Sequence, residues 1–381
     1  MKRLRNGNKK HPPGFGGVII LGAGASKGAS FSDNKGVTPP LDGDFFVHAH
    51  AIFERKGRAH TELRSAKSDW KKFKVAVQRA GINPSKLKNW KLETLTTYLE
   101  ARSNVRFEAK AGKPAKYREA LRLLNIIVCH VLSHSNGCRK CDLHEYIFRK
   151  LKPKAIISFN YDLIADQSIL SLDDLKWSDR VYSYSNNARL GRSSQSRRWF
   201  QGKRRPSTKG ALLLKLHGSI HWNRLQRGEG FQIAGVASFP PRKKSETLEY
   251  LAPPTTPFIV PPVAAKMEIP ESALHAVWSK ASRELRRSSQ WVLWGYSFPQ
   301  TDTITTVLLK TAVKSSRGTK KRLLIINPDP FVGDRTKKSL EKVHIEQFSS
   351  IERFLHEIDL LPIPTSDVSS KKSNMNKRKI K

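Results

Sequence analysis

The stretch GVIILGAGAS, residues 17–26, decides the fold because a short apolar strand runs directly into a glycine turn. Glycine lets the main chain turn sharply and approach a ligand without a Cβ in the way. The start of a following helix offers free N–H groups to an anion such as a phosphate. The spacing of Gly22, Gly24 and Gly28 departs from the dinucleotide-binding pattern G-x-G-x-x-G. The turn therefore indicates either a phosphate site or a packing feature of an α/β protein.

Apolar, strand-like runs recur in the second half of the chain, and helix-like stretches separate several of them. The runs are AIISF (155–159), ALLLKL (211–216), FIVPP (258–262), WVLWGY (291–296) and RLLIIN (322–327). Nearly continuous apolar strands that alternate with helices are typical of a parallel sheet covered on both faces. We therefore predict an α/β fold with a Rossmann-like, mostly parallel sheet covered by helices.

The remaining sequence divides by its pattern and composition. Residues 49–151 have apolar residues at three- and four-residue spacing, which predicts a helical insertion after the first βα unit. Residues 182–210 contain eight Lys or Arg and no acid, which predicts a mobile basic surface loop. Residues 1–13 and 364–381 are predicted to be a flexible basic arm and a disordered basic tail. These segments leave one domain over 14–363.

The formal charge of the chain is +38, which favours contact with nucleic acid or another polyanion. A solubility feature is the competing interpretation of this charge. The apolar runs are too short to cross a bilayer, and the basic start lacks the apolar region of a signal peptide. Three cysteines cannot form a disulfide framework for 381 residues. We therefore expect a cytoplasmic protein without a membrane partner.

Small or polar residues follow the predicted strands. They are, in chain order, Asn160, Asp162, His217, Gly295, Ser297 and Asn327. Ligands of open α/β sheets bind at the carboxyl ends of the strands, so we expect these residues to lie around one cleft. His217 is a candidate general base there. The competing interpretations are that Asp162 only caps a helix and that His217 is structural.

Cys138 and Cys141 have the spacing of two zinc ligands, and Cys129, His130, His134 and His144 lie nearby in the sequence. A structural zinc site is one interpretation of this group. Buried, unligated thiols with separate histidines are the other.

Taken in order, six short motifs resemble the sirtuin-like family. They are GAGAS (22–26), FNYD (159–162), KLHGS (215–219), FIVPP (258–262), GYSF (295–298) and INPDP (326–330). The resemblance spans roughly residues 17–330. It is nearest to a divergent bacterial branch whose members act as NAD hydrolases in anti-phage defence.

This resemblance implies an NAD-binding domain and a role for each matching residue. It implies a phosphate turn at Gly22, Ala23, Gly24, Ala25 and Ser26, a nicotinamide-side pair at Asn160 and Asp162, a catalytic histidine at His217, a phosphate and ribose turn at Gly295 and Ser297, and an adenosine-side residue at Asn327. NAD is then the substrate, and catalysis requires no metal.

One departure from the family bears on the activity. Sirtuin deacylases carry a four-cysteine zinc ribbon, which three cysteines cannot build. We therefore predict an NAD glycohydrolase, with protein deacylation as an alternative. A second alternative is a non-catalytic module that senses NAD or ADP-ribose and associates with nucleic acid. The resemblance also implies a triggered defence effector that forms homo-oligomers on activation. Because of its basic composition, the 182–210 loop is our candidate contact for a polyanion.

Overall fold

The fold is described from a computed structural model. The described residues are 17–31, 37–54, 61–104, 114–170, 188–190, 212–224, 231–233, 257–260, 272–299, 302–315 and 321–357. The predicted arm at 1–13, the tail at 364–381 and most of the basic segment 182–210 lie outside these residues, so those predictions stay open. Within the described part, no helix is long and apolar enough to cross a membrane.

The main sheet has six parallel strands in the order β10-β9-β8-β1-β2-β4. They are β1 (Val18–Leu21), β2 (Ala155–Ser158), β4 (Leu212–Lys215), β8 (Gln290–Trp294), β9 (Lys321–Ile326) and β10 (Val343–Phe348). The central strands are buried along their length, as their continuous apolar sequences require. The predicted Rossmann-like α/β fold is confirmed. β10 was not predicted, because its half-buried edge position does not demand an apolar run.

The six strands end along one row of cross-strand neighbours. From one edge to the other, this row is Phe348, Ile326, Trp294, Leu21, Ser158 and Lys215. The chain steps from β1 to β2 and β4 on one side, and it later adds β8, β9 and β10 on the other. The strand order therefore reverses at β1 and β8, where such folds bind their ligands.

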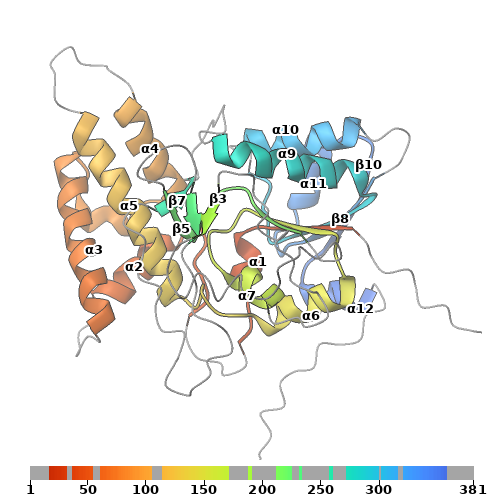
Figure 1. Ribbon diagram of the computed structural model, residues 1–381, viewed down its shortest axis with the longest axis horizontal. Helices are drawn as coiled ribbons and strands as arrows, with labels where there is room; N and C mark the ends of the chain where they lie inside the picture. The colour runs from red at the N-terminus through yellow and green to blue at the C-terminus, as the bar shows by residue number, and fades with distance from the viewer. Residues whose placement is uncertain are drawn as a thin grey trace, which may run out of the picture.

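Helices cover both faces of this sheet (Figure 1). One layer contains α9 (Ser272–Arg287), α10 (Thr303–Lys314) and α11 (Val332–Ser339). The other layer contains α1 (Ala23–Lys27), α6 (Asp142–Leu151), α7 (Ile164–Leu170) and α12 (Ile351–Glu357). Two of the predicted helix-like stretches between apolar runs correspond to α9 and α10.

Between α1 and β2, the described chain forms helices and no strand. They are α2 (Phe45–Phe53), α3 (Thr61–Arg79), the 3-10 helix η1 (Pro84–Asn89), α4 (Leu92–Asn104), α5 (Pro114–His134) and α6. Helices α2 to α5 lie together at one end of the molecule, at the left of Figure 1. Their shared core includes the stacked rings of Phe46 and Phe73 and the Phe53–Trp70 pair. Helix α6 instead packs against α7, beneath the sheet.

A second, smaller sheet has the order β3-β6-β5-β7. It consists of β3 (Ala188–Leu190), β5 (Gly218–Arg224), β6 (Phe231–Ile233) and β7 (Pro257–Ile259). The prediction that FIVPP joins the parallel sheet is wrong, because β7 pairs antiparallel with β5. A turn at Gly218, with φ +81°, takes the chain from β4 into β5 and creates the edge that β7 covers. Likewise, three residues of the predicted 182–210 loop form β3, which is too short to show an alternating pattern.

Candidate functional site

A cavity of about 810 Å³ opens at the carboxyl ends of the parallel strands. Its volume is within the range of small-molecule and cofactor sites. All but one of the residues predicted for the NAD site line it, namely Gly22, Ala23, Gly24, Ser26, Asn160, Asp162, His217, Gly295, Ser297 and Asn327. The exception is Ala25, which is buried behind the turn. Residues from five strand ends thus meet at one cavity.

The glycine turn packs directly against the turn after β8. The Gly22 N–H donates to the Trp294 carbonyl at 2.9 Å, and the Gly24 N–H donates to the Gly295 carbonyl at 2.8 Å. A Cβ on Gly295, whose φ is +66°, would lie 2.0 Å from the Ala25 nitrogen. These glycines are therefore required by packing. Their small size also brings the main chain to the cavity wall, while two of the N–H groups expected to face a ligand are already bonded.

Asn160, Ser26 and Asp162 form one buried network at the floor of the cavity. The Asn160 side-chain amide donates to Ser26 Oγ at 2.8 Å and to the Gly22 carbonyl at 2.9 Å. Ser26 Oγ donates in turn to Asp162 Oδ2 at 2.6 Å. The glycine turn and the loop after β2 are therefore joined by side chains far apart in the sequence.

Asp162 combines this link with the capping role that the sequence left open. Its Oδ1 accepts a hydrogen bond from the Ile164 N–H at 3.0 Å, at the start of α7. Burial raises the pKa of its carboxyl group, while Lys215 and the hydrogen bond from Ser26 oppose that shift. The carboxylate is thus desolvated but held by specific partners.

His217 is half-buried in the turn after β4 and lines the cavity beside an aromatic group. Its ring centroid lies 5.2 Å from Phe159, 6.1 Å from Trp278 and 6.4 Å from Tyr161. The Val260 N–H donates to the His217 carbonyl at 2.8 Å, so β7 secures this turn. The imidazole is therefore presented to the cavity by a turn that both sheets hold.

Trp278 was not predicted as part of the site. Its indole N–H donates to the Leu216 carbonyl at 3.0 Å, and the residue belongs to α9. In the sequence it fits the apolar face of that helix and carries no signal of a site. Only the packing of α9 on β4 brings it to His217.

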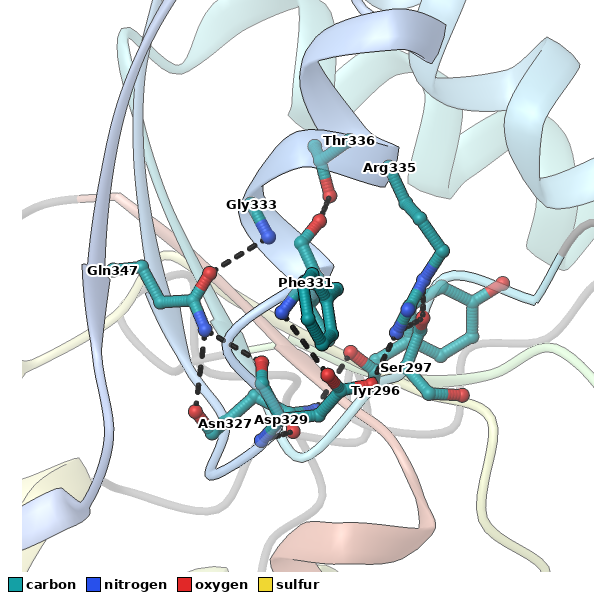
Figure 2. A network of polar contacts seen from close by, with 10 residues as sticks. Tyr296, Ser297, Asn327, Asp329, Phe331, Gly333, Arg335, Thr336 and Gln347 are labelled. Atoms are coloured by element: carbon teal, nitrogen blue, oxygen red, sulfur yellow. Dashed lines mark hydrogen bonds and ion pairs between the residues drawn. The ribbon is translucent and has the colours of Figure 1, made fainter.

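On the other side of the glycine turn, Asn327 and Ser297 belong to a polar network (Figure 2). The Asn327 amide donates to the Tyr296 carbonyl at 3.2 Å, and its Oδ1 accepts from the Asp329 N–H at 3.0 Å. Arg335 donates to the Ser297 carbonyl and pairs with Asp329 Oδ2 at 2.6 Å. Gln347 donates to the Asp329 carbonyl at 2.7 Å and accepts from the helix α11 main chain. The loops after β8 and β9, strand β10 and the start of α11 are therefore joined by one set of hydrogen bonds.

The cavity wall is acidic although the chain is strongly basic. Carboxylates outside the predicted set line it, namely Asp42, Glu93, Asp302, Asp329 and Glu352. Asp302 Oδ2 accepts a hydrogen bond from the Tyr296 hydroxyl at 2.7 Å. The helical insertion contributes Leu92 and Glu93 of α4 together with Val128 and Leu132 of α5. Apart from Asp329, which belongs to the INPDP motif, no local pattern marked these residues, because they reach the cavity only through tertiary packing.

The three cysteines are buried and form no disulfide. Cys141 Sγ accepts a hydrogen bond from the Ser30 N–H at 3.2 Å, and burial raises the pKa values of Cys129 and Cys141. Within the described residues, no three His, Cys, Asp or Glu side chains are grouped as metal ligands. Cys138 and Cys141 are buried in the hydrophobic core next to the start of α6.

No protein-family model and no curated protein matches the sequence. Solved structures of Sir2 proteins show a weak likeness. One Sir2 enzyme is 14% identical with a TM-score of 0.36, and the match covers 87% of both chains. A Sir2 homologue in complex with NAD is 13% identical with a TM-score of 0.32, over 76% of this chain and 90% of that one. A Sir2 homologue with ADP-ribose gives 13% and 0.33, over 66% and 88%.

Proposed function

We propose that this protein binds NAD in the cavity and hydrolyses the bond between nicotinamide and ribose. The balanced reaction takes NAD⁺ and water to nicotinamide, ADP-ribose and a proton. The observation that carries the proposal is that Asn160 and His217 line the same cavity as the glycine turn and Asn327. This is the arrangement that the motif resemblance to sirtuin-like NAD hydrolases requires.

The strand order supports a ligand made of two nucleotide halves. Six strands spaced about 4.8 Å apart give a sheet edge roughly 24 Å long. The glycine turn of β1 is central, with Asn160 and His217 on the β2–β4 side and Ser297 and Asn327 on the β8–β9 side. In the proposed pose, the diphosphate lies over the centre, nicotinamide lies toward Asn160 and adenosine lies toward Asn327.

The proposed chemistry relies on orientation and electrostatics. Positive charge develops on the ribose as the glycosidic bond breaks, as in other glycoside cleavages. The buried carboxylate of Asp162 favours that charge, because its field is poorly screened there. The amide of Asn160 orients the nicotinamide carboxamide or the attacking water. His217 accepts a proton from that water or from a ribose hydroxyl.

The test is release of nicotinamide from NAD by the purified chain, measured without any acyl-lysine peptide. We expect His217→Ala and Asn160→Ala to lower turnover by about 10²–10⁴-fold. The control is His275→Ala, which removes an exposed histidine of α9. Release that depends on an acyl-lysine peptide would favour deacylation instead. ADP-ribose binding without any release would favour the sensing module.

Activation and partners are a separate part of the proposal. The charge of +38 supports a polyanion contact, and the basic segment 182–210 is the candidate. We expect the chain to bind single- or double-stranded DNA or RNA. If it contacts several phosphates, its affinity should fall by about 10³-fold or more between about 50 and about 200 mM salt. Neutralising the arginines of this segment should flatten the salt dependence. Absence of binding at low salt would exclude the contact. A role as a triggered defence effector that assembles into homo-oligomers remains a prediction from the resemblance.

A further inference from the structure

A buried lysine lies beneath the loop that carries Asn160. Lys215 is the last residue of β4 and has no exposed surface. Neither it nor its partner Asp166 of α7 lines the cavity. Moving both charges out of water costs free energy, and specific contacts must offset this cost.

The contacts of Lys215 connect it to the site. Its ammonium group forms an ion pair with Asp166 Oδ2 at 2.9 Å, and the Asp166 carboxylate is equally buried. The same ammonium donates to the main-chain carbonyl of Asp162. The Lys215 ammonium thus binds the main chain of the loop at Asp162, whose side chain belongs to the hydrogen-bonded network with Ser26 and Asn160.

The loop after β2 is held mainly through its carbonyl groups. The Tyr161 carbonyl accepts from the Ile220 N–H at 2.9 Å and from Ser219 Oγ at 3.2 Å. The next carbonyl, that of Asp162, accepts from Lys215. Strands β4 and β5 therefore determine where two successive peptide units of the loop lie.

The position of the Asn160 side chain depends on the position of Asp162. Asp162 Oδ2 accepts from Ser26 Oγ, and Ser26 Oγ accepts from the Asn160 amide. A shift of the Asp162 main chain would move this network away from the cavity wall. His217 lies two residues after Lys215, so the same strand end also supports the turn of the imidazole.

We propose that Lys215 is a positioning residue for the reaction proposed above. It holds the main chain of Asp162, and through Ser26 the amide of Asn160, in the arrangement that cleaves the glycosidic bond. It touches no substrate. The inference rests on the proposed function, and it adds a residue that the motif series did not assign.

The experiment removes the ammonium without leaving a buried charge unpaired. The double variant Lys215→Met and Asp166→Asn keeps both volumes and makes both residues neutral. We expect it to fold, to bind ADP-ribose within threefold of the wild type, and to release nicotinamide at least tenfold more slowly at unchanged KM. The matched control is Asp166→Asn alone, which keeps the bond from Lys215 to the Asp162 carbonyl. Because this control leaves the buried ammonium without its carboxylate, its melting temperature should fall, whereas its kcat should stay within threefold of the wild type.

If the first double variant does not fold, a second neutral variant tests the same inference. In Lys215→Gln with Asp166→Asn, the amide nitrogen lies one carbon short of the ammonium position, so the same loss of kcat is expected. A folded Lys215 variant whose kcat lies within threefold of the wild-type value would overturn the inference and leave the NAD hydrolase intact. A wild-type protein that binds ADP-ribose but releases no nicotinamide would overturn the proposed function and this inference together.

Discussion

The side-chain amide of Asn160 donates a hydrogen bond to Ser26 Oγ at 2.8 Å, across 134 residues of sequence. Ser26 follows the glycine turn of β1, and Asn160 follows β2, so the bond joins two neighbouring strand ends. It orients the amide at the floor of the cavity. The relationship makes Ser26 a determinant of Asn160 geometry.

We therefore expect Ser26→Ala to lower the rate of nicotinamide release by about 10²-fold, because displacing a catalytic group by about 1 Å slows a reaction by that factor. The melting temperature should also fall, because the Ser26 hydroxyl donates to Asp162 and accepts from Asn160, and both buried partners lose a hydrogen bond. Ser85→Ala, in the exposed helix η1, is the matched control. A Ser26→Ala enzyme with normal kcat would show that Asn160 is held without the hydroxyl.

Gly295→Ala is expected to destabilise the protein by about 3 kcal/mol, because it combines positive φ with a clash against the glycine turn. The measurement is the urea midpoint. Gly43→Ala is the control, since a Cβ there meets nothing within 4 Å. Equal midpoints for the two variants would contradict the close packing of the β1 and β8 turns.

The adenosine side is expected to favour NAD over NADP. A 2′-phosphate would meet the carboxylates of Asp329 and Glu352, and Arg335 is already paired with Asp329. Repulsion between these carboxylates and the 2′-phosphate should make NADP bind roughly tenfold more weakly than NAD. Asp329→Asn should lower the ratio of the Kd for NADP to the Kd for NAD, whereas Glu341→Gln, on the exposed surface, should leave this ratio unchanged. Measured Kd values that are equal for both dinucleotides in the wild type would refute this pose.

Stability is expected to fall as the pH drops below 6.5. Burial lowers the pKa of His144 to about 3, and its ring stacks on Trp294 at 4.3 Å. Between pH 6.5 and about 3, the His144 imidazole therefore binds a proton in the unfolded chain but not in the folded chain. Each pH unit in this window costs about 1.4 kcal/mol for this residue. Below pH 3 this contribution levels off.

His144→Phe keeps a ring against Trp294 but removes the titration. The loss of stability between pH 7.5 and pH 5 should therefore be about 2 kcal/mol smaller in this variant than in the wild type. His221, whose pKa burial also lowers to about 3, continues to titrate in both proteins and accounts for part of the remaining slope. Parallel pH profiles for the variant and the wild type would contradict the assignment to His144.

The main sheet was predictable to a large extent. Runs such as AIISF and RLLIIN are buried on both faces of a parallel sheet, so nearly every residue must be apolar. The strand in FIVPP was predicted but assigned to the wrong sheet, since an apolar run does not name its partner. β10 escaped prediction because an edge strand is only half-buried.

By itself, the sequence determined the five buried strands of the main sheet, the helices of the insertion and the small or polar residues at the strand ends. These features follow from local periodicity and from main-chain turns that Gly218 and Gly295 permit. Only the tertiary structure decided that α4 and α5 bring carboxylate and apolar groups to the cavity, and that Lys215 lies beneath Asp162. Such contacts depend on which surfaces pack together over long separations, and no local pattern of residues encodes that choice.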